Sequence, residues 1–319
     1  MTWRLTGQIL ILLVLIIGFF LLFSGIRTSG PVAQGDFLTF LVDNDSASAQ
    51  PQSLLAAVLV SGSALTISIC LASKLLDRRS FSSLGFCITK EWWIDFGFGF
   101  GLGAGLMSLI FLVELTAGWI KIDDYFFTKN PEMTFITSLG YPLVTFLVIG
   151  FYEELFSRGY QLKNLAEGFS GKFLSPRAAI ILSTILTAGG FGLLHVLNPH
   201  SSLSSLLNTI LAGIFLATGY ILTGQLAISI ALHISWNFFQ GCVFGFPVSG
   251  GVFQSATFIL IKQSGPDLWT GGQYGPEAGL LSTIIMIIGI LLISFWVKNR
   301  SGKIDFHLPL IEAPIHPIK

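Results

Sequence analysis

Long apolar runs constrain this chain more than any other feature. About 20 apolar residues suffice to cross a bilayer as an α-helix, and such runs are far too long for the core of a soluble domain. The sequence predicts about eight spans of this kind. They cover approximately residues 6–26, 54–76, 94–118, 137–166, 177–197, 203–223, 225–246 and 278–297. We therefore expect an all-α, polytopic transmembrane helix bundle that forms a single integral membrane domain over residues 1–319.

The composition supports a membrane protein. Of the residues, 52% are hydrophobic and only 11% are charged, and the mean hydropathy is +0.77. A soluble domain carries about 25% charged residues. The formal net charge is zero, so no general attraction to nucleic acid is expected. The lipid bilayer is the expected environment, and nucleic acid is not an expected partner.

The first apolar run has an alternative interpretation. Residues 9–23 follow Arg4, as the apolar region of a secretory signal peptide would. The run is longer than that region usually is, and no clear small-x-small cleavage site follows Phe23. We expect a retained first span rather than a cleaved leader.

Lysine and arginine residues predict the orientation, because they concentrate in cytoplasmic loops. They occur after the second, fourth and last spans: Arg78, Arg79, Lys90, Lys163, Lys172, Arg177, Lys298, Arg300 and Lys303. The loops 27–53 and 119–133 on the opposite side are acidic or mixed. Both termini, including a tail over 298–319, are therefore expected in the cytoplasm. The segment 247–277 then lies outside, where it either re-enters the membrane or caps the bundle.

The third span is rich in glycine. Gly97, Gly101 and Gly105 predict a small-residue face on which another helix can approach closely. Asp95 and Glu114 lie near the ends of this span, and we expect both to be solvated at the membrane interface.

A charged motif stands inside the fourth span. In a helix opened by Pro142, Glu153 lies about 16 Å along the axis, near the middle of a bilayer. Glu154 and Arg158 are four residues apart with the acid first, which favours an ion pair. Glu153 points about 100° away and has no such partner. A poorly solvated carboxylate can serve as a general base; the alternative is a structural charge network between helices.

Two later spans carry a histidine each. His195 ends the fifth span one turn after Phe191, which can cover one side of the imidazole. His233 and Asn237 share a face of the seventh span, where they need partners in the bundle interior. Singly, each has a structural alternative, an interfacial histidine or an interhelical hydrogen bond. Together with Glu153 they indicate hydrolytic chemistry inside the membrane.

These residues form three ordered motifs. They are E-E-x-x-x-R (Glu153, Glu154, Arg158), F-x-x-x-H (Phe191, His195) and H-x-x-x-N (His233, Asn237). In this combination the chain resembles the CPBP family, the CAAX-protease and bacteriocin-processing-like integral membrane proteins. The resemblance covers residues 140–245, with a catalytic core expected over about 137–246. The stretch 270–277 also looks like a segment of some bacterial members, without an assigned role.

The resemblance implies a membrane endopeptidase whose polar cavity opens to the cytoplasm. Glu153, helped by His195, would activate a water molecule. His233 and Asn237 would stabilise the oxyanion of the tetrahedral intermediate. The supporting residues would be Glu154, Arg158 and Phe191.

A zinc-dependent version of this peptidase competes with the metal-free one. Glu153, His195 and His233 would then ligate Zn²⁺, with a water in the fourth position. There is no H-E-x-x-H motif, and the ligands would come from three helices. Because a base and oxyanion donors already account for every residue, we favour the glutamate mechanism without a cofactor.

The depth of His195 needs an explanation. It lies about 28 Å along a straight helix from Pro176, whereas the other groups of the site lie nearer mid-depth. We expect the fifth span to start below the membrane, to tilt, or to bend at Gly189 and Gly190.

Two other classes of function stay open. One is a non-enzymatic scaffold or bacteriocin-immunity factor that keeps the family fold. The other is a transporter with a proton relay, but no pair of broken, repeat-related segments supports it. The chain reads as bacterial in style, so we expect a bacterial plasma membrane and no prenylated target. Peptide precursors or membrane-anchored proteins are the expected substrates.

Overall fold

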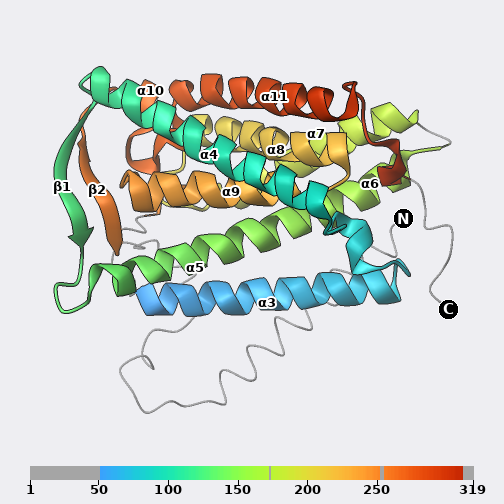
Figure 1. Cartoon of the computed structure of the whole chain (residues 1–319), viewed down its shortest axis with the longest axis horizontal. Coiled ribbons are helices and arrows are strands. Elements are labelled where there is room, and N and C mark those ends of the chain that lie inside the picture. The colour runs from blue at the N-terminus through green and yellow to red at the C-terminus, as the bar shows by residue number, and fades with distance from the viewer. Residues whose placement is uncertain (1–50, 172–173, 252–254, 312–319) are drawn as a thin grey trace, which may run out of the picture.

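The computed structural model describes residues 51–171, 174–251 and 255–311. Six helical units in this part are long and apolar enough to cross a membrane. They are α3 (Pro51–Leu75), α4 (Lys90–Thr116), the unit Phe135–Phe169, α7 (Pro176–Leu194), α8 (Leu203–Thr223) and α11 (Leu280–Ser301). The prediction of a polytopic helical membrane protein is confirmed, and Figure 1 shows the bundle. The predicted first span, 6–26, lies outside the described residues.

The unit Phe135–Phe169 is composite. It consists of α5 (Phe135–Glu154), the π-helix η3 (Leu155–Leu162) and α6 (Lys163–Phe169), which follow one another directly. The hydroxyl of Thr134 caps α5 by accepting a hydrogen bond from the Thr137 N–H at 3.2 Å. The helix therefore begins a full two turns before Pro142, and the prediction that Pro142 opens it is wrong.

Pro142 is accommodated inside α5 by a side chain from elsewhere in the chain. A proline has no N–H to give to the carbonyl four residues earlier, which here belongs to Ser138. The Ser255 hydroxyl donates to that carbonyl at 2.8 Å. The acceptor freed by Pro142 is thus satisfied, as a buried carbonyl must be.

The helix at the centre of the bundle is α9 (Ala227–Phe238), which continues into the π-helix η4 (Phe239–Val243). It is shorter than the predicted span 225–246 and is not among the helices long enough to cross a membrane. Every residue from Ala227 to Asn237 is buried, because α4, α5 and α8 pack around α9. The surface of α9 is apolar on all sides because it contacts other helices rather than lipid.

Glycines bring α4 against α9, but on another face than predicted. A Cβ atom would meet nothing within 4 Å at Gly97, Gly101 and Gly105. At Gly99 it would lie 2.6 Å from the Ile228 carbonyl oxygen, and at Gly103 it would lie 2.8 Å from that of Leu232. Because the glycines alternate along α4, two interleaved four-residue patterns exist, and α9 packs on the second one.

Asp95 and Glu114 of α4 are buried, so the prediction that both are solvated at the membrane interface is wrong. Asp95 is 8% exposed and accepts a hydrogen bond from the Trp296 indole at 2.9 Å, with the Arg300 Nε at 3.3 Å. Glu114 is fully buried, and neither of its carboxyl oxygens has a hydrogen-bond partner among the described residues.

A two-stranded antiparallel sheet lies at one end of the bundle and was missing from the all-α prediction. β1 (Ile120–Thr128) follows α4, and β2 (Ala256–Gln263) pairs with it, with Tyr125 opposite Ile259. Short helical turns follow β2: α10 (Asp267–Thr270), η5 (Gly272–Tyr274) and η6 (Pro276–Ala278). The described part of segment 247–277 adds no span and caps this end of the bundle, one of the two predicted alternatives (Figure 1).

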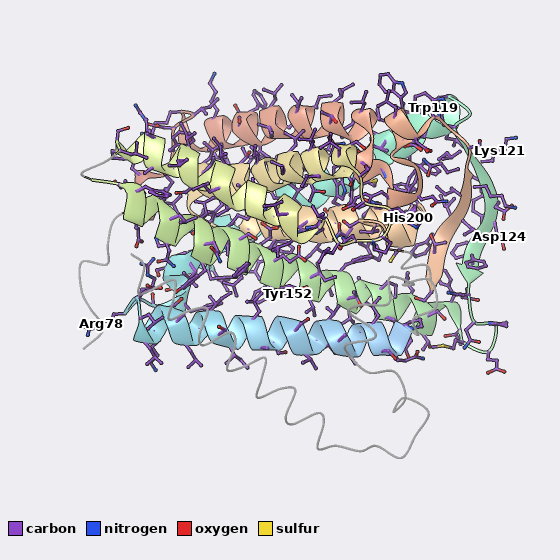
Figure 2. The ribbon with its side chains drawn as sticks, turned by 180° about the vertical axis from the view of Figure 1, so that it is seen from behind. Arg78, Trp119, Lys121, Asp124, Tyr152 and His200 are labelled. Atoms are coloured by element: carbon purple, nitrogen blue, oxygen red, sulfur yellow. The ribbon has the colours of Figure 1, made fainter. Side chains whose placement is uncertain are left out.

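The basic connections meet at the other end. Two short 3₁₀ helices lie there, η2 (Phe81–Leu84) and η7 (Leu308–Ile311). Arg79 donates to both carboxyl oxygens of Glu167, at 2.9 and 2.6 Å. Figure 2 shows Arg78 at the opposite end of the molecule from Asp124. The predicted grouping of the described basic residues on one side is confirmed; that this side faces the cytoplasm stays a prediction.

Candidate active site

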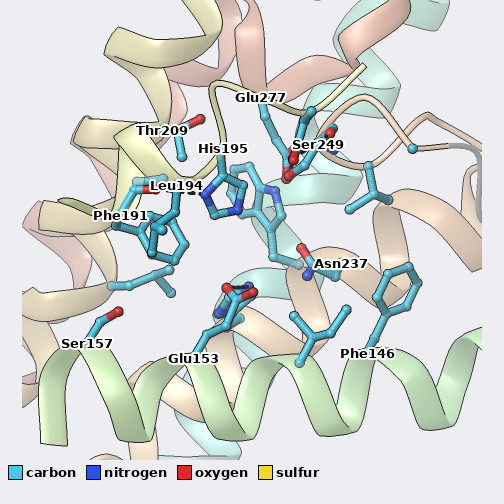
Figure 3. Close-up of a pocket in the computed structure, with 18 of the residues that line it drawn as sticks. Phe146, Glu153, Ser157, Phe191, Leu194, His195, Thr209, Asn237, Ser249 and Glu277 are labelled. Carbon is cyan, nitrogen blue, oxygen red and sulfur yellow. Dashed lines mark hydrogen bonds and ion pairs between the residues drawn. The ribbon is translucent and has the colours of Figure 1, made fainter. Parts of the chain in front are cut away.

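A cavity of about 440 Å³ lies between α5, α7, α8 and α9. All four residues predicted to be catalytic line it, namely Glu153, His195, His233 and Asn237 (Figure 3). Most of the other lining side chains are apolar, among them Phe146, Phe215 and Trp236. Polar groups held in such surroundings interact more strongly than they would in water.

The loops in the cavity lining lie toward the sheet-capped end of the bundle. Asn198 and Ser249 belong to this lining. In Figure 2 the neighbouring His200 lies on the Lys121 side of Tyr152, away from the basic end. The cytoplasmic opening of the cavity therefore stays a prediction. The lining loops lie at the end of the bundle opposite the basic residues, which does not favour it.

Glu154 is the centre of a buried charge network. Its side chain is completely buried, and its Oε1 accepts a hydrogen bond from Arg158 Nη1 at 2.9 Å. His233 Nδ1 lies 2.8 Å from the same oxygen. The second guanidinium nitrogen of Arg158 donates to the Gly213 carbonyl of α8 at 3.0 Å. The predicted i, i+4 pair is confirmed, and it also orients the His233 ring.

Glu153 has no partner on its own helix, as the helix geometry predicted. Its side chain is 22% exposed, and its Oε2 lies 3.9 Å from His233 Nε2, beyond a direct hydrogen bond. Figure 3 shows the carboxylate rising from α5 into the cavity toward His195 and Asn237. Neighbouring carboxylates thus differ: Glu154 is paired, whereas Glu153 faces the space in which a substrate and a water would lie.

His195 is held at the end of α7 by the turn before it. It follows the last residue of the helix, and its Nδ1 lies 2.7 Å from the Phe191 carbonyl oxygen. Because a carbonyl only accepts, Nδ1 carries the proton and Nε2 remains available to the cavity. The ring centre of Phe191 lies 4.6 Å from that of His195 and 6.3 Å from that of His233. Phe191 therefore packs against the His195 ring, as predicted, and makes an edge-to-face contact with the His233 ring.

Two of the three motifs adjoin a π-helix, which the sequence analysis missed, and Arg158 lies inside the first one. η3 begins at Leu155, immediately after Glu154, and η4 begins two residues after Asn237. π-helical turns are rare and are often found at functional sites. No local sequence pattern specifies them, because they arise where packing forces an extra residue into a helical turn.

The long helices bring His195 to the level of Glu153. The unit that carries Glu153 continues for about 24 Å beyond it to Phe169, and α7 starts beside α6 about 28 Å before His195. Both helices extend from the site to the basic end by similar lengths. α7 remains one α-helix through Gly189 and Gly190, so an interruption at the glycine pair is not what brings the groups together.

Glu277 is a carboxylate of this cavity to which the sequence analysis assigned no role. It lies on η6 and lines the cavity opposite Glu153 (Figure 3). Ser249 donates to its Oε2 twice, from the backbone N–H at 2.5 Å and from the hydroxyl at 2.9 Å. Burial raises the pKa of Glu277, while these donors and the nearby His195 oppose the rise. The only sequence signal was the resemblance of stretch 270–277 to some bacterial family members.

The residues that the structure describes do not assemble a metal site. Within the described residues, no three His, Cys, Asp or Glu side chains gather closely enough to hold a metal ion. Glu153 and His233 approach each other, and His195 does not complete a set of three with them. The predicted zinc alternative therefore does not fit this arrangement of side chains.

The segment that contains the three motifs is similar to a known protein family. A family model described as type II CAAX prenyl endopeptidase Rce1-like matches residues 135–239. No curated protein and no solved structure matches the chain. The matched residues contain all three motifs, so the predicted family resemblance is confirmed over this segment. A protease family and six apolar helices support a peptidase with a peptide substrate, integral to the lipid bilayer.

Proposed function

We propose that this chain, whose residues 135–239 are Rce1-like, is an intramembrane endopeptidase that uses Glu153 to activate water. One observation carries the proposal, the contrast between two adjacent carboxylates. Glu154 is bound to Arg158 and His233, whereas Glu153 faces the cavity without a direct hydrogen bond to His233. A purely structural charge network would need Glu154 but not Glu153.

The first step is attack by water on the substrate carbonyl. Glu153 accepts a proton from the water while the oxygen forms a bond to the carbonyl carbon. The free Nε2 of His195 faces the same cavity and helps to orient that water. A positioned general base contributes about two to four orders of magnitude in rate.

The second requirement is stabilisation of the oxyanion. Asn237 offers its side-chain amide, and His233 offers Nε2–H when the ring is doubly protonated. Glu154 supports that charged form, because its carboxylate accepts the Nδ1–H. A positioned donor of this type contributes about 3 kcal/mol.

The last step breaks the peptide bond. Glu153, now protonated, gives its proton to the leaving nitrogen as the C–N bond breaks and the carbonyl reforms. The products are a new carboxylic acid and a new amine, and Glu153 returns to its ionised form; the product acid then releases its proton to the amine or to solvent. The apolar walls around the site limit competing solvation of these charges.

The test compares peptide termini generated by wild type and by Glu153→Gln. Both full-length proteins are reconstituted with membrane proteins and peptide precursors of the host, and new termini are identified by mass spectrometry. Glu153→Gln keeps the size of the side chain and removes the base, so we expect at least about a 100-fold loss of new termini. The matched control is Glu91→Gln, an exposed residue of α4.

Two alternatives predict different outcomes. For a scaffold or immunity protein, Glu153→Gln would retain the cellular phenotype at normal protein levels. For a zinc enzyme, chelation would abolish activity and only zinc would restore it. Under our proposal Glu153→Gln is inactive, and wild type keeps its activity in chelator.

A further inference from the structure

Acidic side chains outnumber permanently cationic ones around the cavity. Among the described residues that line it, Glu153 and Glu277 are acidic and none is lysine or arginine. The nearby Arg158 does not line the cavity and is paired with Glu154. On the Glu277 side, away from the Glu154–His233 pair, a carboxylate among low-dielectric walls attracts ligands of positive charge.

Glu277 is positioned by a strained turn that faces it. Ser249 has a φ of 48°, which a residue with a side chain rarely adopts. This conformation presents both its N–H and its hydroxyl to Glu277 Oε2. Both of these bonds end on one oxygen, and Gln240 is a further donor near the carboxylate. Because a carboxylate can accept about four hydrogen bonds, it keeps acceptor capacity for a ligand in the cavity.

We propose that Glu277 is a specificity subsite that binds a cationic group of the peptide substrate. The inference rests on the proposed peptidase function and adds a substrate class to it, namely peptides with a lysine or arginine that reaches Glu277 while the scissile bond lies near Glu153. Figure 3 shows the two carboxylates on opposite sides of the cavity, with His195 and Asn237 between them. An ammonium or guanidinium at Glu277 offsets the cost of holding its charge among apolar walls.

A purely structural role makes a different prediction. In that case Glu277 only fastens the turn around Ser249 to η6. Its replacement would then affect all substrates alike. Glu277→Gln separates the two roles, because the amide oxygen still accepts from Ser249 while the negative charge is removed.

The experiment measures kcat/KM for pairs of synthetic peptides with the full-length protein in lipid nanodiscs. Each peptide is built of alanine and leucine, is blocked at both ends, and carries one lysine whose position is moved along the sequence. Its partner has norleucine at that position. We expect the best lysine peptide to exceed its partner by about 10- to 100-fold, the range of a charge-assisted hydrogen bond.

Variants assign this preference to Glu277. Glu277→Gln should lower kcat/KM for the lysine peptide more than for its norleucine partner, so that the ratio of the two falls to about one. Glu132→Gln, at an exposed loop position, should keep the preference. Peptides with a free N-terminus and no lysine show whether an α-ammonium occupies the subsite instead of a side chain.

The outcomes distinguish the subsite from the peptidase function. The subsite is overturned if lysine and norleucine peptides are cut equally, or if Glu277→Gln lowers both in parallel; the peptidase proposal then stands. If no peptide is cut, binding of the same pairs is measured. A lysine preference in affinity that Glu277→Gln removes supports the subsite without the peptidase, and its absence overturns the subsite.

Discussion

Arg158 connects the buried charges of the site to the rest of the bundle. It bridges Glu154 and the Gly213 carbonyl, and its Cζ lies 4.6 Å from the ring centre of Phe191. Two side chains, Glu154 and Phe191, and one backbone carbonyl therefore contact the same guanidinium. Loss of this buried ion pair should lower the free energy of unfolding far more than loss of an exposed ion pair.

Arg158→Met should destabilise the protein and lower its activity. Removing one member of a buried pair leaves a carboxylate without its partner, which costs about 3–5 kcal/mol. The control is Arg177→Met, which breaks a 3.1 Å pair with Asp305 whose arginine is 64% exposed, and which should cost less than about 1 kcal/mol. Thermal unfolding in detergent measures both. Equal midpoints for the two variants would contradict the proposed role of Arg158.

Glu114 should be replaceable with a gain in stability. It is fully buried in α4 and has no hydrogen-bond partner among the described residues. Burial of an unpaired polar group is unfavourable, so Glu114→Met should raise the free energy of unfolding by about 1–3 kcal/mol. Asp95→Asn, which disturbs bonds to Trp296 and Arg300, should lower it. A lower midpoint for Glu114→Met would mean that this carboxyl has a stabilising partner.

At the scale of elements, the placement of α9 controls the site, because α9 carries His233 and Asn237. Its position against α4 depends on close approach at Gly99 and Gly103. A side chain added at either position must push α9 away or distort α4. The distance between α5 and α9 at the cavity would then change as well.

Gly103→Ala should therefore lower both stability and activity. Its Cβ would lie 2.8 Å from the Leu232 carbonyl, one residue before His233. Gly101→Ala is the matched control, since a Cβ there meets nothing within 4 Å. Alanine also favours a helix by about 1 kcal/mol over glycine, so Gly101→Ala should be neutral or stabilising. Unfolding midpoints and peptide hydrolysis check both variants, and similar behaviour of the two would contradict this packing.

The elements that sequence analysis predicted well are those whose signal is local. Six of the predicted spans correspond to helices that are long and apolar enough to cross a membrane. α9 resembles a span in composition, but its apolar surface contacts protein on all sides. The choice between Gly101 and Gly103, the two π-helices and the pairing of β1 with β2 depend on what packs against them. Hydropathy and spacing alone do not specify such contacts.

At the scale of the whole molecule, the sequence predicted only part of how the site residues come together. Spacing predicted the Glu154–Arg158 pair and the free Glu153, because both follow from the rise and rotation of a helix. The contact between Glu154 and His233 joins residues far apart in sequence and could not be predicted in that way. Glu277 lines the cavity from η6 and is held there by Ser249, a residue with a positive φ far away in the sequence, so only the three-dimensional fold reveals its place.

The central claim is that Glu153 activates the attacking water, and one kinetic measurement tests it most directly. Once a cleaved peptide is identified, kcat and the dissociation constant of that peptide are measured for wild type and for Glu153→Gln. We predict an unchanged dissociation constant and a kcat lowered by at least about 100-fold, because the base acts on the reaction and not on binding. A Glu153→Gln protein that binds the peptide and cleaves it at a rate close to that of wild type would contradict the account.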